Sequence, residues 1–311
     1  MLRIILILLL VPALEITIAA QSAEPPTSLE STALTEPAST IADEAELIKA
    51  VKAGDLTNVL RLLENGIDPN ATDEDHSSAL CLAVRMNRID IAEALLARNA
   101  KVDPKEDDEG TPLQAAAALG RADLAKLLIA HGANVNHEDH DGHTVLMCAA
   151  FGVVFKGVPD WIAKKLFDVD EEDQEKLSAM GDDHVAVAKL LVEAGANVNT
   201  QADDCGMTAL MIAAMGGNVE LCQILLAHGA DVNLASGELT ALKLAQMGET
   251  TESLQQMLEE EPDSESRQAL INWLQISRPG HLAIAELLRK AGAKAEVSTS
   301  PRDPLSPDPY Q

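Results

Sequence analysis

Apolar and polar positions recur along this chain at helical spacing, and the pattern returns in blocks. In the block that begins at Thr111, "TPLQAAAALGRADLAKLLIAHGANVN", a short apolar run is followed by Leu124, Leu127 and Leu128 at intervals of three and four residues. The blocks that begin at Ser78 and Thr208 repeat the same order of small, apolar and polar residues. Each block therefore predicts two short helices followed by a loop.

The residues at the ends of these predicted helices have a physical reason to be there. A threonine such as Thr111 can cap the first helix because its hydroxyl accepts a backbone N–H that the first turn leaves unpaired. Pro112 follows where no N–H is needed. A pair of alanines leaves room for close helix contact, and a glycine ends the second helix where a left-handed backbone is required. These small residues are Ala116 and Ala117, Ala149 and Ala150, Ala213 and Ala214, and Gly132, Gly195 and Gly229.

The blocks form a repeat of six units. They begin near Ala45 and then at Ser78, Thr111, Thr144, Thr208 and Thr240, with a spacing of 33 residues from Ser78 to Thr144. The interval between Thr144 and Thr208 is 64 residues, so an insert of about 154–183 is expected between the two helices of the fourth unit. The sixth unit has a similar insert at about 249–280.

Both inserts carry apolar residues at helical spacing, which predicts helices. Each contains one of the two tryptophans of the chain, Trp161 and Trp273. Two interpretations stay open. The tryptophans either pack onto the solenoid or the other insert, or they belong to a docking arm, since tryptophan is enriched at interaction hot spots.

The repeated blocks resemble the ankyrin repeat family, and the resemblance covers residues 43–294. It implies an all-α solenoid of about six helix-turn-helix units with β-hairpin-like fingers and two helical inserts. It also implies that partners bind at the finger tips and at the exposed face of the first helices. No nucleophile–base pair or phosphate-binding loop is visible in the sequence. We therefore expect a non-catalytic, monomeric protein–protein interaction module that needs no cofactor.

The corresponding positions in this chain predict a partner-binding groove. Its apolar stripe would be flanked by an acidic rim on the fingers. The alternative is that the apolar positions are scattered and partly covered by neighbouring units. The predicted stripe is Arg85, Met86, Leu119, Phe151, Met215 and Met247, and the predicted rim is Asp107, Asp108, Asp139, Asp141, Asp203 and Asp204.

The net charge of −27 argues against nucleic-acid and anionic membrane partners, because their phosphates would be repelled. It permits a basic protein partner, although a high charge also serves solubility. The finger "NHEDHDGHT" adds an alternative function, metal binding, with His137 and His140 as weak candidate ligands. His143 is interpreted as a variable position before a helix cap. The four cysteines lack the spacing of a zinc site and are expected to be unpaired core residues, although disulfides are an alternative in an exported chain.

The two ends of the chain differ from the repeats. Residues 1–20 combine Arg3, an apolar run and small residues, which is typical of a secretory signal peptide cleaved after Ala20 or Ala23. An uncleaved anchor is the alternative. Residues 21–42 and 295–311 have the composition of a disordered linker and tail. We therefore expect an exported, bacterial-type protein that is periplasmic or secreted, with no membrane span in the mature chain.

Overall fold

The computed structural model describes residues 41–104, 110–155, 183–203, 205–247 and 279–294. The predicted signal peptide, most of the linker and of both inserts, and the tail lie outside these ranges.

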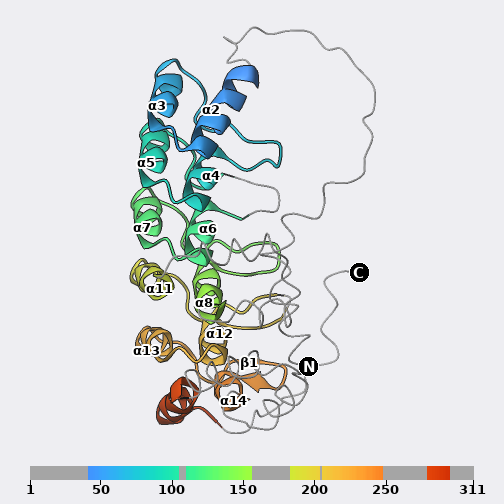
Figure 1. Cartoon of the computed structure of the whole chain (residues 1–311). Helices are drawn as coiled ribbons and strands as arrows, with labels where there is room; N and C mark the ends of the chain where they lie inside the picture. Colours follow the sequence, from blue (N-terminus) through green and yellow to red (C-terminus); the bar gives the residue numbers. More distant parts are fainter. Residues whose placement is uncertain (1–40, 105–109, 156–182, 204, 248–278, 295–311) are drawn as a thin grey trace, which may run out of the picture.

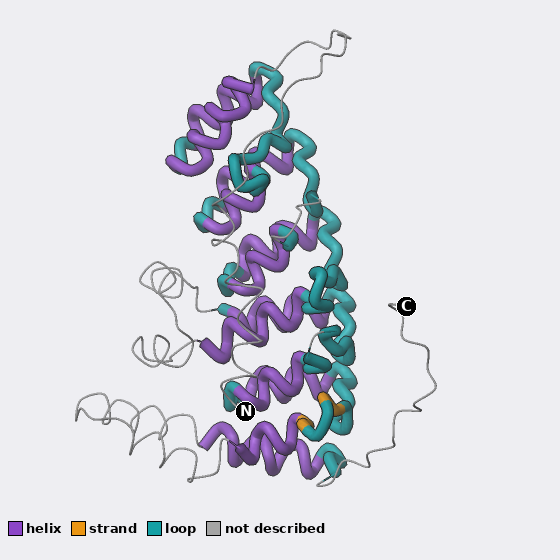
Figure 2. The backbone as a smooth tube through the Cα atoms, turned by 90° about the vertical axis from the view of Figure 1, so that its right-hand side faces the viewer, coloured by secondary structure: helices purple, strands orange, loops and turns teal. Residues whose placement is uncertain are grey.

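The described residues form a stack of helix pairs (Figure 1). The first helices of the pairs make one column and the second helices make another, so the chain moves along the stack one pair at a time. Figure 2 shows loops and turns along one edge of the stack. None of the described helices is long and apolar enough to cross a membrane. The first helices are α2 (Ile41–Ala53), α4 (Ala79–Arg85), α6 (Pro112–Ala118), α8 (Val145–Phe155), α12 (Ala209–Met215) and α14 (Ala241–Met247). The second helices are α3 (Leu56–Glu64), α5 (Ile89–Ala97), α7 (Ala122–Ala130), α11 (His184–Glu193), α13 (Val219–Ala227) and a final helix at 279–290.

The predicted hydroxyl caps are confirmed. Thr111 Oγ1 accepts the backbone N–H of Gln114 at 3.3 Å, and the Gln114 side chain accepts the N–H of Thr111 at 3.0 Å, which completes a capping box. Ser78 and Thr208 cap α4 and α12 in the same way, at 3.1 and 3.3 Å. The sequence therefore determines where each of these first helices begins.

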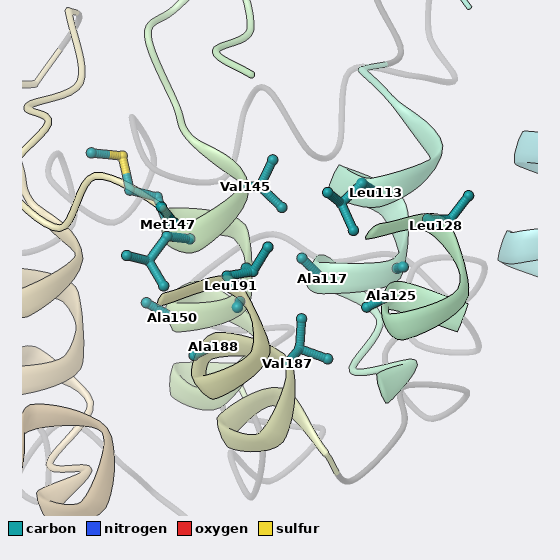
Figure 3. Close-up of a cluster of buried hydrophobic side chains, with 14 of the residues drawn as sticks. Leu113, Ala117, Ala125, Leu128, Val145, Met147, Ala150, Val187, Ala188 and Leu191 are labelled. Atoms are coloured by element: carbon teal, nitrogen blue, oxygen red, sulfur yellow. The ribbon is translucent and has the colours of Figure 1, made fainter. Parts of the chain in front are cut away.

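The core runs along the stack between the helix pairs. Both alanines of the pair in α6, Ala116 and Ala117, have no exposed surface, and neither do Leu124 and Leu128 of α7. Figure 3 shows these layers meeting, with side chains of α6, α7, α8 and α11 packed together. Because small residues line the first helices, neighbouring pairs approach closely, and the leucines fill the space between second helices.

The loops between pairs are short fingers with little strand. Thr72 pairs with Ser78 and Glu138 with Thr144 in isolated antiparallel bridges. The hairpin β1 (Ala235–Ser236) and β2 (Leu239–Thr240) pairs Ala235 with Thr240 and Ser236 with Leu239. Consequently the fold is an all-α repeat with hairpin-like fingers.

A ladder of hydrogen bonds joins each pair to the next, and sequence reasoning missed it. Each rung begins with an Asn or Asp that lies four residues after the positive-φ residue at the end of a second helix. A side-chain oxygen of this Asn or Asp accepts a backbone N–H from the next pair. We call this the Asn/Asp ladder. Its rungs run from Asn70 to Lys101 (2.8 Å), Asp103 to Asn134 (2.8 Å), Asn136 to Asn197 (2.7 Å), Asn199 to Asp231 (2.7 Å) and Asn233 to Lys294 (3.1 Å).

Candidate partner-binding face

The predicted apolar stripe lies at the C-terminal ends of consecutive first helices. Met86, directly after α4, has 40% of its surface exposed, and it is one of three large apolar residues exposed among those described. Leu119 and Met215 occupy the corresponding ends of α6 and α12 and are half-buried. Arg85 is also half-buried, and its Nη1 donates to Ser77 Oγ at 3.5 Å. The stripe therefore has an exposed end at Met86 and a partly covered middle.

Phe151 belongs to the same stripe but is also in contact with an internal cluster. Its ring meets the ring of His143 edge-on, with centroids 6.0 Å apart and an interplanar angle of 79°. His143 is 4% exposed, and its backbone carbonyl accepts a hydrogen bond from Gln114 Nε2 at 3.2 Å. His143 is thus a packed residue that links two helix pairs, a role that its interpretation as a variable position did not predict.

Asp139 holds the finger turn that contains His143. Its Oδ1 accepts the backbone N–H groups of Asp141 at 3.0 Å and His143 at 2.8 Å, and its Oδ2 lies 3.3 Å from His143 Nδ1. Burial alone would raise the pKa of Asp139, but the hydrogen bonds from His143 outweigh burial and hold the pKa below its usual range. This carboxylate is already engaged inside its own finger.

Asp73 holds the turn of an earlier finger, the one that follows α3, in the same way. Its Oδ1 accepts the N–H groups of Asp75 at 3.1 Å and Ser77 at 2.9 Å, and its Oδ2 lies 2.8 Å from Lys52 Nζ. Burial would raise the pKa of Asp73, and the bonds from Lys52 and Ser77 lower it overall. An aspartate five residues before the helix cap was the sequence signal for this turn, shared by Asp73 and Asp139.

The exposed carboxylates of the fingers are a different set of residues. Asp203 is exposed, whereas the Asp141 side chain is 29% exposed and lies 3.1 Å from His140 Nε2. Asp203 N donates to Asp141 O at 2.8 Å, and a Cβ placed on Gly142 would come within 2.7 Å of Asp203 N. The two fingers therefore pack closely because residue 142 is glycine. Further exposed carboxylates are Glu74, Asp75 and Glu138.

Several predicted contact residues have no described side chain. Met247 ends α14, but its surroundings are not described. The others lie outside the described residues, namely Asp107, Asp108, Trp161, Asp204 and Trp273. Their partner-binding role stays a prediction, as does the choice between packing and docking for the inserts.

The histidines of the finger "NHEDHDGHT" point to no common site. His137 is half-buried, and His140 is mostly exposed beside Asp141. Within the described ranges, no group of three or more His, Cys, Asp or Glu side chains could hold a metal ion.

Two other histidines connect helix pairs. His184 begins α11 and His281 lies in the final helix, and both are buried. His184 Nε2 lies 3.0 Å from Ala118 O, and His281 Nε2 lies 3.0 Å from Met215 O. Each ring thus reaches back to the end of a first helix in the preceding pair. This contact fixes the chain where it returns from each predicted insert.

The cysteines lie in the described residues and form no disulfide. Cys81 and Cys222 are buried. Burial raises the pKa of the Cys222 thiol to about 12. Burial also raises the pKa of the Cys148 thiol to about 12, with a further contribution from the Asp139 carboxylate. These two thiols are consequently poor nucleophiles at neutral pH.

Comparison with known proteins agrees with the geometry. Residues 102–173, 156–236 and 176–268 match the family described as "Ankyrin repeats (3 copies)", and together they span more than half of the 311-residue chain. The chain belongs to the ankyrin repeat family. Residues 47–96 match "Ankyrin repeats (many copies)" as well. Ankyrin repeat domains are generally non-catalytic and serve protein–protein interaction.

A curated relative matches over a short segment. The mouse (Mus musculus) protein named "2-5A-dependent ribonuclease" is 41% identical over 61 residues, which is 19% of this chain and 8% of the ribonuclease. The match is confined to the repeats. It therefore concerns the repeat sequence and not the activity in that protein's name.

Proposed function

We propose that this ankyrin repeat protein is a non-catalytic module that binds one protein partner along the concave face formed by its first helices and fingers. The observation that carries the proposal is the recurrence of apolar residues at two adjacent register positions of the first helices, seven or eight residues after the start of each unit. They are exposed Met86 and half-buried Leu119, Phe151 and Met215. Methionine adapts its shape to a partner at little cost. We call this surface the partner-binding face.

The charges of the fingers favour a basic partner. Glu74, Asp75, Glu138 and Asp203 are exposed beside this face, and the chain carries a net charge of −27. Opposite charge on the partner would speed association, and like charge would disfavour competitors. We further propose six repeat units, a count supported by the five rungs of the Asn/Asp ladder in the described residues.

Site-specific photo-crosslinking tests the binding face. A benzophenone amino acid replaces Met86 in one variant and Leu60 in the other. Leu60 lies on the second helix α3 and is 39% exposed, against 40% for Met86, so the two probes are matched in exposure. We expect one protein to crosslink to position 86 and not to position 60. Equal crosslinking at both positions, or crosslinking at position 60 alone, would contradict the proposed face.

We also propose that the protein works outside the cytoplasm, on the basis of the signal-peptide pattern at residues 1–20. Fractionation of cells that express the full chain tests this directly. We expect the exported fraction to contain a shortened chain that begins near residue 21 or 24. Recovery of an unshortened chain in the cytoplasmic fraction would contradict export.

A further inference from the structure

One rung of the Asn/Asp ladder differs from the others in its chemistry. The acceptor is asparagine at Asn70, Asn136, Asn199 and Asn233, but it is a carboxylate at Asp103. In two asparagine rungs the amide also donates to the next pair, from Asn136 Nδ2 to Gly195 O at 3.4 Å and from Asn199 Nδ2 to Gly229 O at 3.1 Å. A carboxylate cannot make that donation.

Only one of the two oxygens of the Asp103 carboxylate accepts a hydrogen bond from the described residues. Its Oδ2 accepts the Asn134 N–H at 2.8 Å, whereas Oδ1 is shielded from solvent and receives no hydrogen bond from the described residues. A shielded oxygen without a donor costs free energy in the unbound protein. The chain therefore keeps at this rung a group that would gain from a donor.

A pocket of about 410 Å³ lies beside this carboxylate, between the finger that follows α3 and the loop that follows α5. Asn70, Thr72, Ser78 and Pro104 line it with Asp103, and apolar atoms make up more of the lining than polar atoms do. His76 and Lys101 also line it, and both are exposed. We call this space the inter-finger pocket.

We propose that the inter-finger pocket holds an arginine side chain of the protein partner, with Asp103 as its counter-charge. The inference rests on the proposed function and adds one anchor to it. A guanidinium carries N–H donors for the Asp103 carboxylate, and the aliphatic stem of arginine suits the apolar part of the lining. In the complex Oδ2 keeps the Asn134 N–H, and the guanidinium approaches the carboxylate from the pocket that Asp103 lines.

The charges of the lining decide between a cationic and an anionic ligand. Asp103 attracts a guanidinium, and Lys101 opposes it. Replacing Lys101 with glutamine should therefore strengthen binding of an arginine peptide, whereas an anionic ligand would respond in the opposite direction. Two variants of opposite sign thus separate this pocket from a general attraction to the acidic fingers.

The experiment titrates acetyl-Gly-Arg-Gly-amide into the full chain and follows backbone amides by NMR. We expect saturable shifts at Lys101, Asp103 and Asn134. The affinity should fall roughly tenfold in Asp103→Asn and rise in Lys101→Gln. Asp203→Asn, which removes the same charge from another finger, should leave the affinity within about twofold. The same peptide with citrulline in place of arginine, which is neutral and of similar shape, should bind at least roughly tenfold more weakly than the arginine peptide.

Four results would overturn the proposal. They are the absence of localised shifts, an equal loss in Asp203→Asn, equal binding of the citrulline peptide, and weaker binding in Lys101→Gln. The thermal unfolding midpoint of each variant shows that it is folded. Crosslinking at Met86 does not depend on this pocket. Failure of the peptide titration would therefore overturn only the arginine site, whereas failure of the crosslinking experiment would overturn the partner-binding face.

Discussion

Replacing Asp103 with asparagine should stabilise the free protein. The new side chain keeps the acceptor for the Asn134 N–H, which the carboxylate now bonds at 2.8 Å. It also replaces the shielded oxygen Oδ1, which has no donor among the described residues, with an NH₂ group. The counterparts of this group in Asn136 and Asn199 donate to a glycine carbonyl of the next pair. The variant therefore removes an unsatisfied acceptor and adds a donor.

The expected gain is about 1–2 kcal/mol in the free energy of unfolding, since one unsatisfied group is relieved and one hydrogen bond of ordinary net strength is added. For a domain of this size, each kcal/mol corresponds to about 2–4 °C in the unfolding midpoint. Differential scanning calorimetry and urea unfolding followed by circular dichroism measure the change. A higher urea midpoint at an unchanged slope would assign the gain to stability.

The reverse change at Asn199 is the matched control. Asn199→Asp keeps the acceptor for Asp231 and removes the donor to Gly229, so the midpoint should fall. The fall should be smaller than the gain at Asp103, about 0.5–1 kcal/mol, because Asn199 is exposed. If Asp103→Asn lowers the midpoint while Asn199→Asp has its expected effect, the idea that Asp103 is an unsatisfied rung is refuted.

Three further predictions concern the finger turns and the thiols. Asp139→Ala should lower the free energy of unfolding by roughly 2–4 kcal/mol, because two N–H groups and the His143 ring lose their acceptor. The control Asp203→Ala, at an exposed position, should lower it by under about 0.5 kcal/mol. Equal losses in the two variants, measured by urea unfolding, would contradict the internal role of Asp139. The pKa values of Asp73 and Asp139 are lower in the folded chain than the ordinary value of 3.8, so their stabilisation is present above that pH and is lost as the pH falls through the folded values. The urea midpoint should therefore drop steeply below about pH 4 and less so in Asp139→Asn, and an identical acid profile in both proteins would speak against this linkage. Cys148 and Cys222 have pKa values of about 12 in the folded chain. They should therefore react with a disulfide reagent about a thousandfold more slowly in the folded chain than in the urea-unfolded chain. Rapid labelling of the folded protein would show that the thiols are not desolvated.

The fold could be predicted because its signals are local. Each signal is a single residue with its own backbone requirement. Thr111 caps a helix, Pro112 is the first helical residue, and Gly132 ends a helix in the left-handed region with φ of 89°. The alanine pairs then define which sides of the helices meet. None of these inferences needs knowledge of what lies next to the residue in space.

The candidate site was harder to predict because its residues act across pairs. Sequence reasoning placed Asp139 on an exposed rim, but the carboxylate bonds its own turn. It also left His143 without a role, since the partners of this ring, Phe151 and Asp139, are revealed only when the finger folds onto α8. The recurrent "ANVN" motif was visible, but its reach to the next pair was not. In contrast, exposed Met86 was identified from the register alone.

The Asn/Asp ladder has a consequence for how this solenoid accommodates extra chain. Asn70 and Lys101 are 31 residues apart, and Asn136 and Asn197 are 61 apart, yet their rungs measure 2.8 and 2.7 Å. In the sequence, the additional residues come between the two helices of a pair and not within the loops that carry the rungs. The position of one helix pair relative to the next therefore does not depend on the length of the turn between the two helices of a pair. The turn at Gly216 and Gly217 after α12 should accept a grafted peptide of similar length, so the same scaffold can carry new recognition segments without being rebuilt.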